Sequence, residues 1–176
     1  MKKKIILSLL VIVALFTVTG CGNSKTENNG KTEKQNEVIK VDIDDITVNL
    51  DSTKELNKLS FKYDTKSERS KVEHLNGKNY YMTDYYSNGS VGLRISIEYK
   101  EGMTVAEVMN TKTGTSQGNK SFNNIEWKYY EGLTKNKENV YYYAYQYDKD
   151  TYLIEFVTNK NIDNLIDIFM NNVSFK

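Results

Sequence analysis

The sequence predicts an α+β fold, in which an antiparallel sheet is flanked by a few helices. Residues 91–99 alternate strictly between apolar and polar side chains, which is typical of a strand with one buried and one wet face. Asn-Gly pairs occur at 76–77 and 88–89, and this dipeptide favours tight hairpin turns. Two later segments, which begin at residues 105 and 162, repeat apolar residues with the helical period instead.

The turn at Asn88-Gly89 joins the strand 91–99 to the segment before it. A two-residue turn predicts a register that matches the apolar residues of the two strands: Tyr86 with Val91, Met82 with Ile95 and Tyr80 with Ile97. The same register places Asp84 opposite Leu93 on the inner face, where burying a carboxylate is costly. We therefore expect a β-bulge that turns Asp84 outward, and the alternative is that Asp84 is a functional polar group.

Three further regions have the apolar pattern of extended segments. Their apolar positions are Val41, Ile43, Ile46 and Val48 in the first, Leu59, Phe61 and Tyr63 in the second, and Ile125, Trp127 and Tyr129 in the third. A turn at Asn123-Asn124 precedes the third region, and Asn76-Gly77 predicts another hairpin.

The segment from Glu138 to Phe156 is rich in tyrosine and is predicted to form a hairpin with Lys149-Asp150 as its turn. The predicted pairs are Tyr147 with Tyr152, Tyr145 with Ile154 and Tyr143 with Phe156, all on one face. A tyrosine row with period two is more often a face of the core than a platform for a ligand. The opposite face carries Tyr142, Ala144, Gln146, Leu153, Glu155 and Val157, and it is either covered by a helix or free to meet a partner.

Two helices are predicted. Thr104 and Glu107 fit a capping box, so a short helix should begin at Val105, with Met103 and Val108 as the hydrophobic staple. A longer amphipathic helix should follow Asn161, its expected cap. Its apolar stripe, which should lie on the sheet and close the core, consists of Ile162, Leu165, Ile166, Phe169, Met170 and Val173.

The N-terminus has the pattern of a secretory signal. Three lysines precede an apolar run from Ile5 to Val18, which is shorter than the roughly 20 residues of a membrane span. The run ends in Val18-Thr19-Gly20-Cys21, which resembles the lipobox of bacterial lipoproteins. This resemblance implies that residues 1–20 are removed and that Cys21 receives a diacylglyceryl group, whose two acyl chains anchor the mature chain to the membrane.

The remaining chain divides into a linker and one domain. Residues 21–37 comprise the lipidated Cys21 and a polar, disordered tether, which spans roughly 20–25 Å as a flexible chain. Residues 38–176 have the length of a single domain. Removing residues 1–20 removes three lysines and no acid, so the formal net charge changes from +1 to −2. We expect no nucleic-acid partner, because such binding calls for a basic surface.

Several phrases of the sequence also point to a family. They are the lipobox and the runs LSFKYD, VGLRISIEYKEGMTVAEVMN and YLIEFVTNKNIDNLIDIFMNNVSF. Together with the order of the predicted elements, they resemble the PsbP-like lipoproteins of Gram-positive bacteria over residues 59–176. The resemblance implies an α/β/α sandwich and an accessory or binding role. Members commonly carry a Pro and a Trp after the strand that corresponds to 59–63, whereas this chain has no Pro.

The sequence offers little for catalysis or for metal binding. Cys21 is the only thiol, and His74, the only imidazole, is best explained as a surface residue beside a turn. Asp42 and Asp44 would share one strand face, but the spacing and the glycine of a calcium loop are absent. We therefore expect no enzyme activity, no metal and no cofactor.

The leading prediction is a lipid-anchored lipoprotein on the extracytoplasmic face of the cell membrane. Its domain would be a non-catalytic binding or accessory module for another envelope protein or a cell-wall component. The alternative is a receptor for a small ligand or glycan that uses tyrosines on the outer faces of the sheet, namely Tyr81, Tyr85, Tyr130 and Tyr142. A third possibility, a hydrolase, would require two carboxylates that converge in a cleft.

Overall fold

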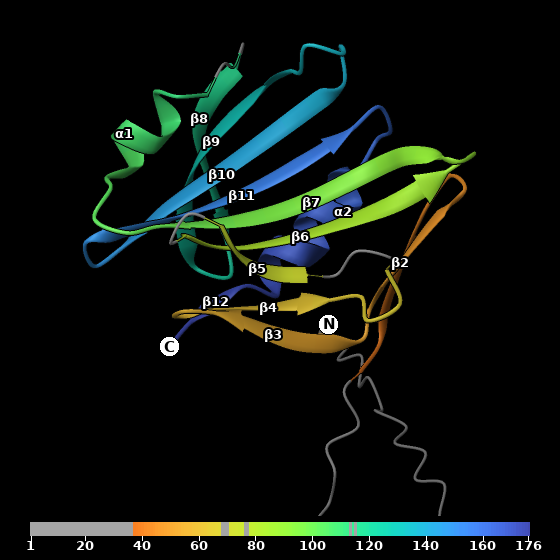
Figure 1. The fold of residues 1–176 in the computed structure, drawn as a ribbon, viewed down its shortest axis with the longest axis horizontal. Helices are drawn as coiled ribbons and strands as arrows, with labels where there is room; N and C mark the ends of the chain where they lie inside the picture. The colour runs from red at the N-terminus through yellow and green to blue at the C-terminus, as the bar shows by residue number, and fades with distance from the viewer. Residues whose placement is uncertain (1–36, 68–70, 76–77, 113, 115) are drawn as a thin grey trace, which may run out of the picture. The chain divides into compact units, whose positions relative to one another are not determined.

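The computed structural model describes residues 37–67, 71–75, 78–112, 114 and 116–176 (Figure 1). The predicted signal peptide, Cys21 and the tether up to residue 36 lie outside the described residues, as does the predicted turn at Asn76-Gly77. Residues Gln35–Lys176 form one compact unit.

The described residues form twelve strands and two helices. In chain order they are β1 (Ile39–Ile43), β2 (Ile46–Leu50), β3 (Ser52–Leu56), β4 (Leu59–Tyr63), β5 (Lys71–Leu75), β6 (Lys78–Ser87), β7 (Ser90–Lys100), α1 (Val105–Met109), β8 (Ser116–Phe122), β9 (Ile125–Leu133), β10 (Asn139–Tyr147), β11 (Asp150–Thr158), α2 (Asp163–Asn171) and β12 (Ser174–Phe175).

The strands form three sheets, and every pairing among the described residues is antiparallel (Figure 1). The largest sheet has seven strands in the order β5-β6-β7-β11-β10-β9-β8. A three-stranded sheet has the order β12-β4-β3, and β1 and β2 form a separate hairpin. Both smaller sheets contact β6 of the large sheet, through β2 and β3.

One hydrophobic core joins the large sheet to α2 and to the two smaller sheets. The α2 residues Leu165, Ile166, Phe169 and Met170 are buried in it, as the apolar stripe of this segment predicts. Phe169 packs edge-on against Phe156 of β11, with ring centroids 5.5 Å apart, and near Phe61 of β4 at 6.3 Å. Helix and strands therefore cover the same inner face of the large sheet.

The predicted fold class, a helix-flanked α+β sheet in an α/β/α sandwich, is wrong. The structure is mostly β, with three antiparallel sheets and only two helices among the described residues. The helices are short, at five and nine residues. The strands β1 to β4 make much of the layer that packs on the inner face. The apolar residues that alternate along β1, β2 and β4 are buried in the core.

The β6–β7 hairpin contains the predicted bulge, and the bulge changes the register. Tyr86 pairs with Val91 as expected, but the register shifts between Tyr85 and Tyr86. Met82 consequently pairs with Ser96 rather than with Ile95, and Asp84 pairs with Arg94 rather than with Leu93. The extra residue is Gly92 of β7, which has no partner between Val91 and Leu93, so the pairing beyond it is shifted by one residue and Tyr81 and Tyr85 point into the core.

The tyrosine-rich hairpin has the predicted faces but not the predicted register. The turn is Asp148-Lys149, one residue earlier than expected, with Asp148 at φ 55°. Tyr147 pairs with Asp150, Tyr145 with Tyr152 and Tyr143 with Ile154. The register differs by two residues, and because side chains alternate with period two, the same residues still face the core.

The short helix α1 covers part of the outer face of the large sheet (Figure 1). Its capping box is confirmed: the Glu107 N–H donates to Thr104 Oγ1 at 3.2 Å, and the Thr104 N–H donates to Glu107 Oε2 at 2.8 Å. Val108 and Met109 pack on Ala144 and Leu153, which form a second buried cluster. The face opposite the tyrosine row is therefore partly covered by a helix.

Candidate functional site

A polar pocket opens where β2, the segment after β4 and the end of β6 meet. We call it the Tyr86 pocket, and it has a volume of about 260 Å³. It is lined by Asp45, Ile46, Thr47, Asn49, Asp64, Lys66, Ser67, Asp84, Tyr85 and Tyr86. These residues come from three segments that are distant in the sequence.

Two consecutive tyrosines at the end of β6 line this pocket. Side chains of neighbouring residues point to opposite faces of a sheet, and Tyr85 and Tyr86 follow this rule. Tyr85 is 7% exposed and belongs to the core, whereas Tyr86 is 37% exposed. Burial raises the pKa of the Tyr85 hydroxyl well above its usual range, so Tyr85 is a neutral phenol at physiological pH.

Asp64 forms one wall of the pocket and is 2% exposed. The backbone N–H groups of Asn49 and Lys66 donate to its two carboxylate oxygens at 2.9 and 2.8 Å. These bonds tie β2 to the turn after β4. The neighbouring Ser67 accepts a hydrogen bond of 2.5 Å from Thr83 of β6, so the same turn is also held to the large sheet.

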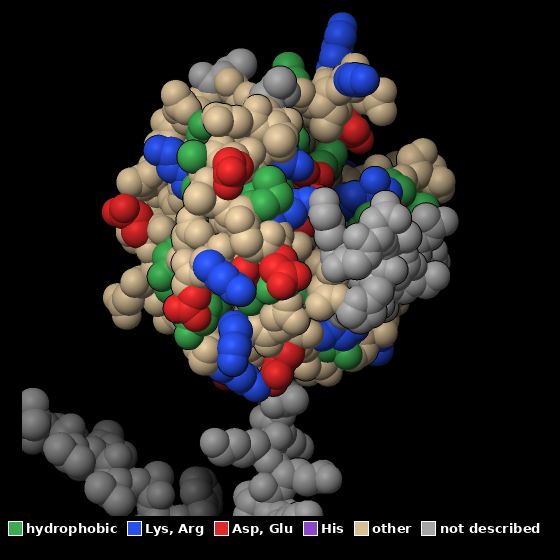
Figure 2. Space-filling model, turned by 60° about the vertical axis from the view of Figure 1, so that its left-hand side comes forward, with side chains coloured by type: hydrophobic (Ala, Val, Ile, Leu, Met, Phe, Trp, Pro, Cys, Tyr) green, Lys and Arg blue, Asp and Glu red, His purple; other side chains and the backbone are tan. Residues whose placement is uncertain are grey.

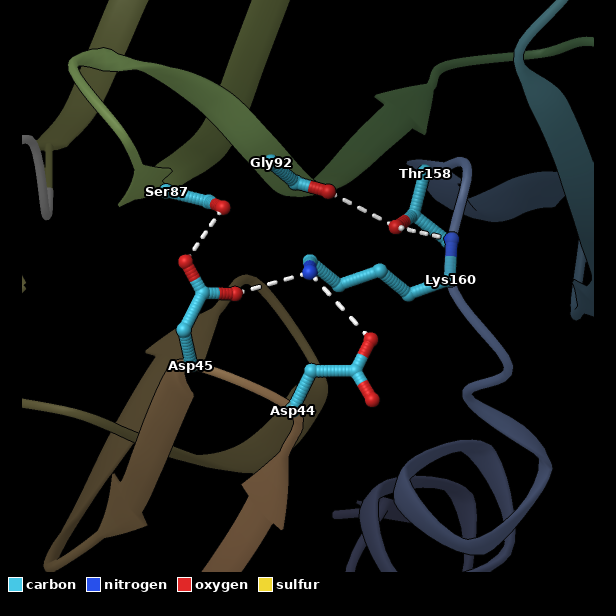
Figure 3. A network of polar contacts seen from close by, with 6 residues as sticks. All are labelled: Asp44, Asp45, Ser87, Gly92, Thr158 and Lys160. Carbon is cyan, nitrogen blue, oxygen red and sulfur yellow. Dashed lines mark hydrogen bonds and ion pairs between the residues drawn. The ribbon is translucent and has the colours of Figure 1, made fainter.

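A network around Lys160 holds Asp45, one of the residues that line the pocket (Figure 3). The Lys160 ammonium donates to Asp44 Oδ2 at 3.2 Å and to Asp45 Oδ1 at 2.7 Å, and Ser87 Oγ donates to the other oxygen of Asp45 at 2.5 Å. Thr158 Oγ1 donates to the Gly92 carbonyl at 2.7 Å. The network fixes the β1–β2 turn to the end of the large sheet. Beyond it lies a second opening of about 370 Å³, lined in part by Asp44, Gly92 and Lys160.

Asp84 completes the acidic residues of the pocket. Its side chain is 0% exposed, and its two oxygens accept hydrogen bonds from Arg94 Nε at 2.6 Å and Arg94 Nη2 at 3.0 Å. The bond to Asp84 raises the pKa of the Arg94 guanidinium, which stays charged. Asp84 thus turns outward as predicted, but it is buried by a bidentate ion pair rather than exposed.

The positive and negative formal charges at the Tyr86 pocket largely compensate one another. Three aspartates and one lysine line it, and Arg94 and Lys160 are bound to two of these aspartates. With Asp44, which shares Lys160 with Asp45, four acids and three bases leave a formal charge of only −1. The pocket therefore offers many hydrogen-bonding groups without a strong net field.

The Lys160 network predicts a specific dependence of stability on pH. Hydrogen bonds from Lys160 and then Ser87 lower the pKa of Asp45 from 3.8 to about 2. A lowered carboxyl pKa stabilises the fold above about pH 4, and that stabilisation is lost as the pH falls through about 2. In thermal melts, Asp45→Asn should be less stable than the parent at pH 6, and the difference should shrink towards pH 2. Asp148→Asn, at an exposed turn, is the control; a difference that is constant with pH would contradict this assignment.

The structure separates the four tyrosines that were predicted to lie on outer faces. That prediction is wrong for Tyr81 and Tyr85, which are buried on the inner face. Tyr130 and Tyr142 do lie on the outer face, where they pack beside α1 in the second cluster. Burial raises the pKa of Tyr142 to about 12, and Lys112 lies over its ring at 5.0 Å. Only Tyr85 of the four lines the Tyr86 pocket.

Sequence reasoning missed the residues that make the pocket, apart from Tyr85 and Asp84. Tyr86 was assigned to the inner face, and Asp45, Asp64 and Lys66 were not singled out as binding residues. The available signal was the mismatch at Asp84, because the bulge that resolves it also places Tyr86 at the pocket. Nothing in the spacing of residues 45, 64 and 86 indicates that they meet.

The described residues contain no group of three or more His, Cys, Asp or Glu side chains that could hold a metal ion. Asp42, one of the possible calcium ligands, is occupied by Lys40 Nζ at 2.9 Å and Thr47 Oγ1 at 2.7 Å. His74 belongs to β5. Among the helices of the described region, neither is long and apolar enough to cross a membrane.

The surface mixes the two signs of charge. Figure 2 shows acidic and basic side chains interspersed on one face, with hydrophobic side chains in small separate areas. Among described residues, the large hydrophobic side chains that are exposed are Val38, Tyr86 and Leu133. Of these three, Tyr86 lines the Tyr86 pocket.

Comparison with known proteins does not assign a family. No protein-family model matches the chain, and no curated protein matches it with significant similarity. The resemblance to PsbP-like lipoproteins therefore stays a prediction from the residues quoted above.

Proposed function

We propose that this chain is an exported lipoprotein, held on the extracytoplasmic face of the cell membrane by diacylglyceryl-Cys21. Its β-rich domain acts as a non-catalytic binding module for another component of the envelope. The single observation that supports a binding role best is the Tyr86 pocket, where an exposed aromatic ring borders a concave surface dense in hydrogen-bonding groups.

The arrangement of the acids favours binding over catalysis. A general acid or base needs a pKa near the working pH and a free position for the proton. Asp45 and Asp84 are bound to cations, and Asp64 accepts two backbone hydrogen bonds. Three acids do line one pocket, as a hydrolase would require, but each has a structural role there.

The envelope location rests on the N-terminal sequence. The apolar run and the lipobox support export and lipidation, and a polar tether of about 16 residues would keep the domain roughly 20–25 Å from its anchor. The alternative function, a receptor for a small ligand or glycan, gains from the position of Tyr85 and Tyr86 at one pocket. This alternative specifies what the module binds, and it is compatible with a lipid anchor at Cys21.

Replacing the anchor cysteine tests the proposal directly. Cys21→Ala should abolish incorporation of a fatty-acid label, because no other thiol exists in the chain. The variant should either leave the membrane fraction or accumulate as an unprocessed precursor. Mass spectrometry of the N-terminus and cell fractionation measure both results.

Ser24→Ala, three residues further along the same tether, is the matched control and should behave as the parent. Unchanged labelling and membrane retention of Cys21→Ala would refute the anchoring. A turnover that disappears on replacing Asp64 alone, with the fold intact, would refute the non-catalytic role.

A further inference from the structure

We propose that the Tyr86 pocket binds a neutral, polyhydroxylated ligand of the size of one sugar ring. This inference rests on the proposed binding function and names the class of its ligand. It is carried by the charge balance of the pocket, by the kinds of polar group that line it, by its exposed tyrosine and by its volume.

The charge balance disfavours an ionic ligand. Each aspartate of the pocket already has a partner: Lys160 for Asp45, Arg94 for Asp84, and two backbone N–H groups for Asp64. A cationic ligand would have to displace these partners or share them. An anionic ligand would approach three carboxylates, with the Lys66 ammonium as the one cation that itself lines the pocket. A neutral ligand meets neither difficulty.

The polar groups suit hydroxyls, which donate and accept hydrogen bonds at the same atom. Carboxylates accept up to about four hydrogen bonds over their two oxygens, so Asp45 keeps acceptor capacity beside its bonds to Lys160 and Ser87. The side chain of Asp45 is 44% exposed, so an incoming hydroxyl can reach it. Asn49 and Lys66 add amide and ammonium donors.

Tyr86 supplies the apolar contact that such a ligand needs. The face of an aromatic ring has a negative electrostatic potential and attracts the polarised C–H groups of a sugar ring. At 37% exposure, Tyr86 presents part of its ring to solvent at the rim of the pocket, and its backbone pairs with Val91 of β7. The neighbouring Tyr85 is held in the core and gives the pocket a rigid wall.

The volume limits the size of the ligand. At about 30 Å³ per water molecule, the 260 Å³ of the pocket corresponds to roughly nine waters, and hence to a ligand of about ten non-hydrogen atoms. A single sugar ring such as glucose, with about twelve non-hydrogen atoms, comes close to this limit, and a larger substituent or a longer glycan would extend from the pocket into solvent.

Titrations followed by NMR test this inference. They use the chain from residue 21 to residue 176, that is, the whole protein without the predicted signal peptide. Glucose and N-acetylglucosamine are the neutral probes, and spermidine and inorganic phosphate are the charged ones. We expect saturable shifts of the backbone amides of Asn49, Lys66 and Tyr86 with at least one neutral probe, and none with the charged probes. Tyr86→Ala should weaken the binding at least tenfold, whereas Leu133→Ala, at another exposed apolar side chain, should leave it unchanged.

The inference would be overturned by saturable binding of spermidine or phosphate at these amides, by sugar-induced shifts only elsewhere in the domain, or by equal binding of sugar to the parent and to a folded Tyr86→Ala variant. Absence of any shift with both sugars overturns it as well. The proposed function is tested separately, by the labelling and location of Cys21→Ala. If the protein is lipid-anchored but binds none of the four probes, only the proposed ligand class is refuted.

Discussion

Replacing Arg94 with methionine is expected to lower the free energy of unfolding by about 3 kcal/mol, the largest single effect we anticipate. Arg94 reaches both oxygens of Asp84, at 2.6 and 3.0 Å, and the Asp84 side chain has no exposed surface. Removing the guanidinium leaves the buried Asp84 carboxylate without these two hydrogen bonds. Such a loss exceeds the net contribution of the pair, because the remaining charge keeps its desolvation penalty. Urea unfolding at neutral pH measures it.

An exposed ion pair provides the control. Lys40 and Asp42 lie 2.9 Å apart, with more than half of each side chain exposed, so Lys40→Met should change stability by less than about 1 kcal/mol. The double variant Asp84→Asn, Arg94→Met should be more stable than Arg94→Met alone, since it removes the buried charge. If Arg94→Met and Lys40→Met have equal effects, the buried ion pair does not contribute as described.

Replacing Gly92 with alanine is expected to destabilise the fold by about 2 kcal/mol through overpacking. A β-carbon at this position would lie 2.7 Å from Ser87 Cβ and 2.9 Å from Ile46 Cδ1. The Ser87 atom is attached directly to the backbone, so it can move away only if the β6–β7 turn moves. Thermal melts should show the loss. Because Ile46 and Ser87 hold the β1–β2 hairpin beside the Tyr86 pocket, the same variant should also weaken ligand binding.

Gly118 of β8 is the matched control for Gly92. It is also a strand glycine, but a β-carbon there would meet no atom within 4 Å. Gly118→Ala should therefore be neutral or slightly stabilising, since alanine restricts the unfolded chain more than glycine does. Equal destabilisation by the two substitutions would contradict the close approach at Gly92.

The strands that alternate clearly were predictable from the sequence, and so was the start of α1. Residues 91–99 form most of β7, the Asn123-Asn124 turn precedes β9, and Thr104 caps α1 as its spacing with Glu107 indicates. Each of these depends on neighbours within a few residues. Local patterns of this kind decide the element before tertiary packing does.

Register and layer arrangement were not predictable in the same way. A bulge at Gly92 and a turn at Asp148-Lys149 shift the pairing by one and two residues, and both depend on the packing of whole strands. The helix-flanked sandwich was inferred from family resemblance, whereas β1 to β4 supply much of the packed layer in the structure. A sequence pattern shows which side of a strand is apolar, but it does not show what covers that side.

The candidate site could not be predicted from the sequence either, because it also depends on tertiary packing. Asp45, Asp64 and Tyr86 meet only because the β1–β2 hairpin and the turn after β4 pack against the end of β6. Their residue types carry no signature of a binding site when read singly. The tyrosines that are concentrated at residues 141–147 mainly pack in or against the hydrophobic core.

The claim that the Tyr86 pocket is the binding surface of a membrane-tethered module is tested most directly by photo-crosslinking on intact cells. A photoreactive side chain is placed at position 86 and, as the control, at position 133, which is 57% exposed and is not among the residues that line the pocket. We predict an envelope adduct that forms from position 86, is absent from position 133, and is suppressed by the neutral sugar that binds in solution. Identical adducts from both positions, or an adduct from position 86 that the bound sugar leaves unchanged, would contradict the claim.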